Sequence, residues 1–268
     1  MNDRRFWLLA ALAFLPFVCV TAVAGCLAAG PCNLAMTAAD VSPVLIVGPL
    51  LLVSGLVGVA VAIRFALTAG FAALELSRLQ RLRAVPPLLD RLARVAGVTR
   101  LVCIRDDSPV AFCAGFLRPT VFMSDGAVAK LSQRELLAVL HHERDHAERH
   151  EPGLRAARMA AAHVVQLPIV RWWCERQNAR SELAADQAAE RWVGSEAVAG
   201  ALLVMTPTRR TLAAFTARAE MRARRLLGLE IEEPPVPPGA WATTLAAGWV
   251  ATVTAACLFN ALLALGWR

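Results

Sequence analysis

The sequence contains no tyrosine, and charged residues make up only 18% of its 268 positions, while 57% are hydrophobic. A soluble domain has a more even balance, with about 25% charged residues. Together with a mean hydropathy of +0.51, the shortage of charge argues against an ordinary soluble domain. It favours a protein that is embedded in the lipid bilayer.

Close cysteine pairs and interleaved basic and aromatic side chains are also missing. None of the seven cysteines forms a CxxC pair, which argues against a zinc site built from thiolates. The net charge is +7, but without that interleaving it indicates orientation against the cytoplasmic leaflet, and we expect no direct binding of nucleic acid. Cys26 and Cys32 flank a short loop where a disulfide can form, although free cysteines are the favoured interpretation.

Three long hydrophobic runs divide the chain, at about residues 6–29, 43–64 and 240–267. Each is long enough to cross a bilayer, which takes about 20 residues. We expect 6–29 to be a retained span, because its apolar core is too long for a signal peptide. The second run is followed by a helix-prone segment with several arginines, so we expect one helix that leaves the membrane and continues into the cytoplasm.

Basic residues indicate the orientation. Arg4 and Arg5 precede the first run, the loop 30–42 has no Lys or Arg, and arginines are frequent after Arg64. By the positive-inside rule, the N-terminus and the long middle segment are cytoplasmic, in a protein integral to the cytoplasmic membrane. The predicted organisation is two spans in 1–83, a working domain in 84–230, a proline-rich linker in 231–239 and a last span in 240–267.

Most of the middle segment has helical patterns. Residues 99–105 and 110–122 instead predict short strands, because they are rich in Val, Ile and Phe and are interrupted by turns at 106–109 and 117–119. The apolar stretch 156–173 can be a further span, a re-entrant segment or a buried helix, and we favour a buried or partly inserted helix. The predicted fold class is a mainly α membrane protein whose spans flank an α+β domain with a small β-sheet.

The segment 131–150 has the features of a capped helix. Ser132 followed by Glu135 matches a capping box, and the leucines after it supply an apolar face. The Pro-Gly pair at 152–153 is expected to end the helix. His142 and His146 are therefore predicted to lie on one face of this helix, since residues four apart project from the same side.

Two histidines at this spacing can each place a nitrogen about 2 Å from one Zn²⁺. Glu143 then lies beside the metal without binding it, and it can accept a proton from a water that the metal has made acidic. Downstream, Glu182 can be the third ligand, and Asp186 can hold the other ring nitrogen of a ligating histidine. The motif thus predicts a zinc-dependent hydrolase.

Alternatives stay open for the residues around the motif. Glu182 and Asp186 can also form an ordinary acidic helix face that pairs with arginine. His141 is one residue out of register and His150 lies four residues beyond His146, and we expect neither to be a ligand.

A segment ahead of the histidine helix is a candidate edge strand. Zinc peptidases commonly hold a peptide substrate as an added strand along such an edge, although a core strand is an equally good interpretation. The residues concerned are Ala111, Phe112, Cys113, Ala114 and Gly115.

Longer segments around the histidine motif are similar to those of a known protein family. The runs 136–146, 167–173 and 182–186, within about residues 108–191, resemble the membrane metallopeptidases of the BlaR/MecR type. The resemblance implies a gluzincin-type zinc site and control of a BlaI/MecI-type transcriptional repressor, through its cleavage or release. The site residues that it implies are His142, His146 and Glu182 as ligands, Glu143 as base and Asp186 as their hydrogen-bond partner.

Two features depart from that family. Its sensing receptors carry an external penicillin-binding domain after the last span, whereas this sequence ends at Arg268, so we expect a short form without the sensor. Asp145 stands where the family usually has a small residue, and we expect its carboxylate to point away from the metal.

These observations predict a membrane-embedded zinc endopeptidase that acts on a regulatory protein or peptide close to the bilayer. One alternative is an HtpX-type quality-control peptidase or a prenyl-protein peptidase. Another is a non-catalytic membrane receptor that binds metal and signals by changing conformation. A purely structural helical membrane protein would bind no stoichiometric metal.

Overall fold

The computed structural model describes residues 43–79, 84–205, 213–229 and 235–251. The predicted first span, the Cys26–Cys32 loop and residues 252–267 of the last run lie outside the described residues. The chain divides into two compact units. The first comprises Met1–Arg64, Ala161–Trp172 and Val236–Arg268, and the second comprises Phe65–Ala160 and Trp173–Pro235.

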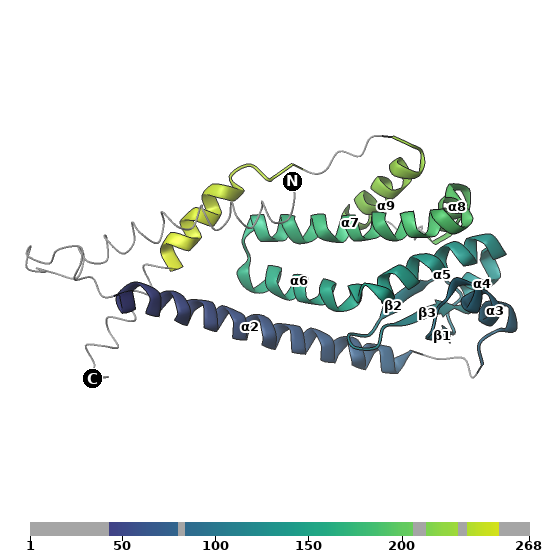
Figure 1. Cartoon of the computed structure of the whole chain (residues 1–268), viewed down its shortest axis with the longest axis horizontal. Helices are drawn as coiled ribbons and strands as arrows, with labels where there is room; N and C mark the ends of the chain where they lie inside the picture. The colour runs from purple at the N-terminus through teal and green to yellow at the C-terminus, as the bar shows by residue number, and fades with distance from the viewer. Residues whose placement is uncertain (1–42, 80–83, 206–212, 230–234, 252–268) are drawn as a thin grey trace, which may run out of the picture. The chain divides into compact units, whose positions relative to one another are not determined.

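Helix α2 (Pro43–Arg78) is a single uninterrupted helix (Figure 1). Within the described parts of the chain, its stretch Val57–Arg78 is the one segment long and apolar enough to cross a membrane, judged by length and composition. Apolar side chains along it are exposed, among them Phe71 at 64%. The second hydrophobic run therefore lies on a helix that continues beyond Arg64.

A three-stranded sheet lies in the second unit. Its strands are β1 (Leu101–Ile104), β2 (Ala111–Ala114) and β3 (Thr120–Ser124), in the order β1-β3-β2. Strand β3 pairs in parallel with β1 and antiparallel with β2, which leaves β2 at an edge. The predicted strands are confirmed, and the predicted turn at 117–119 lies between β2 and β3, which form a hairpin. Gly115 makes its turn possible, with a φ of +106°.

The predicted histidine helix is α5 (Gln133–Glu148), and its capping box is present. The Ser132 backbone N–H donates to Glu135 Oε2 at 2.7 Å, and the Glu135 N–H donates to Ser132 Oγ at 3.4 Å. These bonds satisfy backbone donors that have no partner inside the helix. The cap thus fixes where α5 begins, and with it the register of the residues that follow.

The predicted end of this helix is wrong. Helix α5 stops at Glu148, and α6 (Glu151–Val165) begins after a turn in which His150 has a φ of +52°. Pro152 lies in the first turn of α6, where a missing N–H costs nothing because such groups have no partner inside the helix. The proline therefore starts the next helix instead of ending α5.

The apolar stretch 156–173 is divided between two helices. Helix α6 ends at Val165, and α7 (Pro168–Val193) begins three residues later. A single helix spanning these residues is therefore excluded. On α6, Ala156 and Ala160 are buried while Met159 is 58% exposed, so only one face of that helix is covered.

Helix α5 is the centre of the second unit. It packs on β2, on β3, on α3 (Pro87–Ala96) and on α8 (Ser195–Met205), as Figure 1 shows. Helix α4 (Asp125–Lys130) follows β3, and α9 (Ala213–Leu226) packs on α8. The largest buried apolar side chains of this core include Leu89, Met123, Leu136 and Leu140. Because α5 supplies two of these leucines, the core also determines where its histidines lie.

Replacing Leu136 with alanine should lower the free energy of unfolding by about 2–5 kcal/mol, because a side chain that is 0% exposed leaves a cavity. The matched control is Leu117→Ala, at a side chain 91% exposed, which should change that free energy by less than about 0.5 kcal/mol. Chemical denaturation in detergent, followed by tryptophan fluorescence, measures both variants. Equal effects of the two substitutions would contradict the assignment of Leu136 to the core.

Candidate metal centre

His142 and His146 lie on one face of α5, as their spacing predicts. Their Nε2 atoms are 3.1 Å apart, and the two rings meet edge to face at an interplanar angle of 83°. Both side chains are largely buried, at 10% and 8% exposure. Two ring nitrogens therefore face the same small volume, out of the solvent.

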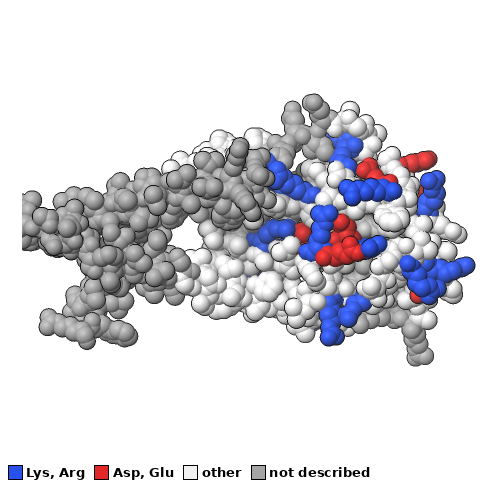
Figure 2. Space-filling model, viewed as in Figure 1, with Lys and Arg blue, Asp and Glu red and all other residues white. Residues whose placement is uncertain are grey.

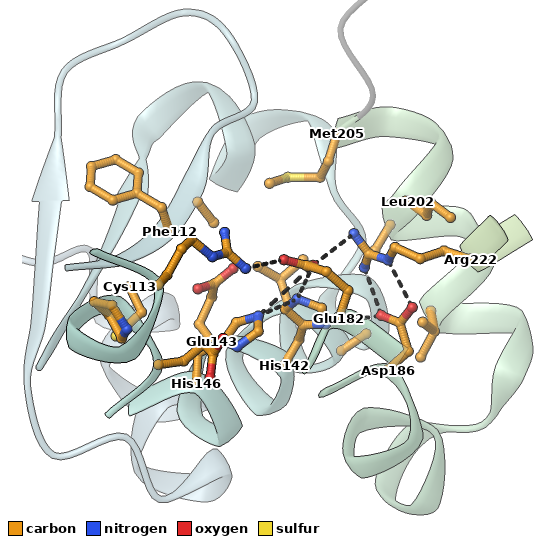
Figure 3. A pocket seen from close by; sticks show the side chains of 18 residues that line it. Phe112, Cys113, His142, Glu143, His146, Glu182, Asp186, Leu202, Met205 and Arg222 are labelled. Atoms are coloured by element: carbon orange, nitrogen blue, oxygen red, sulfur yellow. Dashed lines mark hydrogen bonds and ion pairs between the residues drawn. The ribbon is translucent and has the colours of Figure 1, made fainter. Parts of the chain in front are cut away.

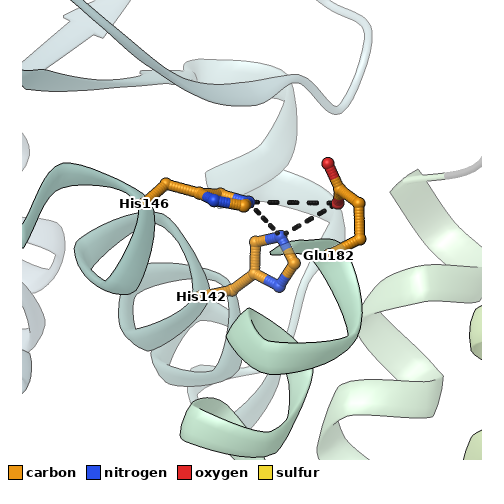
Figure 4. Close-up of side chains that lie close together, drawn as sticks. All are labelled: His142, His146 and Glu182. Atoms are coloured by element: carbon orange, nitrogen blue, oxygen red, sulfur yellow. Dashed lines mark hydrogen bonds and ion pairs between the residues drawn. The ribbon is translucent and has the colours of Figure 1, made fainter. Parts of the chain in front are cut away.

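Glu182 reaches this volume from α7. Its Oε2 lies 3.5 Å from Nε2 of His142 and 3.9 Å from Nε2 of His146 (Figure 4). A tetrahedral zinc ion with ligands at 2.0–2.1 Å separates its ligand atoms by about 3.4 Å. All three donor atoms lie within 4.8 Å of one another, so two imidazoles and a carboxylate form a triangle that fits such an ion.

Asp186 follows one turn later on α7 and is fully buried. Its Oδ1 lies 2.9 Å from Nδ1 of His142. Because a carboxylate accepts, this bond keeps a proton on Nδ1 of His142. In the neutral imidazole, the Nε2 lone pair then faces His146 and Glu182. Asp186 thus has the geometry of a residue that orients a metal ligand.

Arg222, from α9, holds Asp186 in turn. Its Nε donates to Oδ2 at 2.7 Å, and its Nη2 donates to Oδ1 at 2.6 Å. Burial opposes the charge on Asp186, but the hydrogen bonds from His142 and Arg222 outweigh it and hold the pKa of the carboxyl below its usual value. The carboxylate therefore stays ionised and keeps accepting from His142.

Glu182 also contacts arginine. Arg155, from α6, donates from Nη2 to Oε1 of Glu182 at 2.5 Å, and Nη1 of Arg222 lies 3.7 Å from Oε2. Burial alone would raise the pKa of Glu182, but the hydrogen bond and charge of His142, with the charges of His146 and Arg155, hold it well below its usual range. In the space-filling view of Figure 2, acidic side chains likewise lie grouped among basic ones.

Neither arginine was predicted from the sequence. Arg155 is 27 residues from Glu182, and Arg222 is 36 residues from Asp186, so no helical spacing connects them. Arg222 also stands in the arginine-rich segment 217–225, which has the pattern of a solvated helix face. The one feature of the sequence that could have indicated them is the excess of arginine over lysine around the motif.

The two histidines differ in their tendency to bind a proton. Burial opposes the charge on His142, yet the carboxylates of Asp186, Glu182 and Glu143 raise its pKa to about 9. Burial lowers the pKa of His146 to about 3, and the neighbouring charge of His142 acts in the same direction. Near neutral pH the pair therefore carries one excess proton, on His142, while His146 is neutral.

Glu143 lies beside this pair and lines the same cavity. It is 8% exposed, and burial raises the pKa of its carboxyl, with the charge of His142 as the main opposing influence. A carboxylate with a raised pKa accepts a proton more readily than an exposed one. Glu143 is therefore suited to serve as a general base.

The other polar residues near the motif point elsewhere. Asp145 accepts from Arg149 at 3.0 Å and neither lines the cavity nor belongs to the metal-binding group, although its side chain is only 12% exposed. His141 stacks on Trp192, with ring centroids 5.1 Å apart, and His150 lies in an exposed turn. Neither histidine belongs to the metal-binding group found among the described residues.

A cavity of about 340 Å³ opens onto the triangle (Figure 3). Of the candidate strand residues, Ala111, Phe112 and Cys113 line it, whereas Ala114 and Gly115 do not. Burial, with the charge of Glu143, raises the pKa of the Cys113 thiol to about 12, so this cysteine stays protonated and is not a nucleophile. The apolar wall opposite is supplied by α8, through Val198, Ala201, Leu202 and Met205.

No protein curated for its function matches this sequence significantly. The model of peptidase family M48, however, matches residues 77–223. This match covers more than half of the chain and includes every residue of the triangle, with Glu143, Asp186 and both arginines. The chain therefore belongs to peptidase family M48, and this membership implies metallopeptidase activity.

Proposed function

We propose that this protein is a zinc-dependent endopeptidase of the cytoplasmic membrane. The observation that carries the proposal is the buried triangle of His142, His146 and Glu182, because two imidazoles and one carboxylate form a donor set that leaves a fourth position open on zinc. Bound there, zinc would supply a Lewis acid that polarises the scissile carbonyl and makes water acidic enough to react near neutral pH.

The chain's own residues would handle the protons. Glu143 accepts the proton that the attacking water loses and later delivers it to the nitrogen of the leaving amine. Its raised pKa suits both steps, since the carboxyl can hold the proton between them. Asp186 keeps His142 in the tautomer that presents Nε2 to the metal.

The cavity suggests how a peptide binds. Strand β2 is an edge strand, so an extended peptide can pair with its free edge beside Ala111, Phe112 and Cys113. The apolar wall from α8 favours an apolar side chain next to the scissile bond. A stretch of substrate without secondary structure of its own fits this arrangement.

The stretch Val57–Arg78 and the low charge of the chain support a membrane-bound enzyme. The frequent arginines after Arg64 support a cytoplasmic active site. The BlaR/MecR-like motifs support a regulatory substrate, such as a BlaI/MecI-type repressor or another protein close to the bilayer. Membership of family M48 is equally compatible with general quality control of membrane proteins. Glu143 favours either peptidase over a receptor that only binds metal, because metal binding alone does not require this carboxylate.

Substituting Glu143→Gln should leave zinc bound and lower peptide hydrolysis by about 10²–10⁴-fold, because the amide cannot accept the proton. Metal analysis with a chelator-treated control and hydrolysis of unfolded casein measure the two properties. The matched control is Glu148→Gln, at a side chain 59% exposed that pairs with Arg144, and it should change neither. Hydrolysis by Glu143→Gln at the unmodified rate would rule out Glu143 as the base.

Substituting Asp186→Asn should weaken zinc binding by about 10–100-fold, because His142 loses the carboxylate that fixes its tautomer. Competition with a zinc-binding dye in detergent gives the dissociation constant. Asp90→Asn serves as the control, since Asp90 pairs with Arg94 at the surface and lies away from the cavity. Equal zinc affinity in the two variants would contradict an orienting role for Asp186.

Zinc binding should also depend on pH. Because the pKa of His142 is raised to about 9, its proton is present at pH 7 and must leave before zinc can bind. The apparent affinity should therefore rise with pH, by up to about tenfold per unit, and level off near pH 9. The same dye competition, repeated from pH 6.5 to 9.5, measures this slope. A constant affinity over that range would show that no such proton is displaced.

A further inference from the structure

Arg155 contacts the triangle from a helix that supplies none of its ligands. It projects from α6, its side chain is 34% exposed, and it lines the cavity. Its Nε is buried without a hydrogen-bond partner in the described part of the chain. A buried donor without a partner destabilises the folded protein. The ion pair with Glu182 offsets this cost, so the place of the guanidinium depends on that carboxylate.

Its position matches the needs of Glu182. The Nη2 of Arg155 donates to Oε1 at 2.5 Å, while Oε2 of the same carboxylate faces the two histidine nitrogens. A glutamate that ligates zinc can do so through one oxygen or through both. With Oε1 held by the guanidinium, only Oε2 is free to ligate.

We propose that Arg155 is a positioning residue that holds Glu182 for ligation through Oε2 alone. This inference rests on the proposed zinc site and adds a residue to it. Arg155 keeps the carboxylate oriented before metal arrives and keeps its second oxygen off the metal afterwards. A fourth position on the ion then stays open for water and substrate.

Arg222 does not duplicate this role. Two of its nitrogens donate to Asp186 at 2.7 and 2.6 Å, and its remaining approach to Glu182 is 3.7 Å, beyond hydrogen-bond length. The two arginines thus serve different carboxylates. Arg222 orients His142 through Asp186, and Arg155 orients Glu182 directly.

The main test replaces Arg155 with methionine, which keeps the length of the side chain but removes its donors. Zinc should bind about 10–100-fold more weakly, because the ligand is no longer oriented in advance. In the Co²⁺-substituted protein, the visible absorption should weaken, since a carboxylate that binds through both oxygens raises the coordination number above four. Zinc affinity comes from dye competition and the cobalt bands from titration, both on the full chain in detergent.

A matched control lies on the same helix. Arg158 donates to Glu151 at 2.7 Å and to Asn178 at 2.8 Å, and it does not contact the triangle. Arg158→Met therefore breaks a comparable ion pair on α6 and should leave zinc affinity and cobalt bands unchanged. If it alters them as strongly as Arg155→Met does, the effect belongs to the packing of α6 and the inference is overturned.

A conservative variant separates position from mere charge. Arg155→Lys keeps one donor for Oε1, so it should bind zinc within about fivefold of the unmodified protein and retain most of its cobalt absorption. If zinc affinity falls as far in Arg155→Lys as in Arg155→Met, the role of the single hydrogen bond is overturned. The comparison of Arg155→Lys with the unmodified protein remains a test even if the methionine variant folds poorly.

The outcomes distinguish the inference from the proposed function. If the unmodified protein binds no stoichiometric zinc, the proposed function itself fails. If it binds zinc but Arg155→Met binds as tightly, with the same cobalt spectrum, the metal site stands and the positioning role of Arg155 is rejected.

Discussion

Three of the carboxylates that line one largely buried pocket are Glu143, Glu182 and Asp186, and the rest of the site depends on how their charge is balanced. Ionised carboxylates are costly to bury without partners. Here Arg155 and Arg222 each pair with one of them, and His142 binds a proton between Asp186 and Glu182. Glu143 has the weakest compensation, and burial therefore raises its pKa. The same balance that permits burial thus leaves one carboxylate able to exchange a proton.

Helix α5 connects this chemistry to the stability of the fold. Its capping box sets the first residue, and Leu136 and Leu140, both 0% exposed, fix the helix against the core. The histidine pair follows at the next turns of the same helix, so its register is inherited from the core and cannot slip independently. A rigid helix is a better support for a metal site than a loop, since small displacements of a ligand weaken binding.

How much the sequence could predict depends on the distance over which each interaction acts. His142, Glu143 and His146 follow from helical spacing, and the cap from a four-residue pattern. Pro152 was misassigned because a proline ends one helix or begins another according to its position, which local composition does not determine. The two arginines could not be predicted, because their contacts join helices that are distant in the sequence.

The position of the candidate substrate strand in the sheet also depends on contacts that the local sequence does not predict. Its residues suited an edge or a core strand equally well, and only the strand order makes β2 an edge. That order in turn depends on the hairpin at Gly115, whose φ of +106° brings β3 back beside β2 and places β3 between the other strands. Helix α5 packs on β2, and residues of this strand line the same cavity as Glu143 and the histidine pair. A peptide paired with that edge would therefore run past the base and the metal ligands together, which is the arrangement that hydrolysis requires.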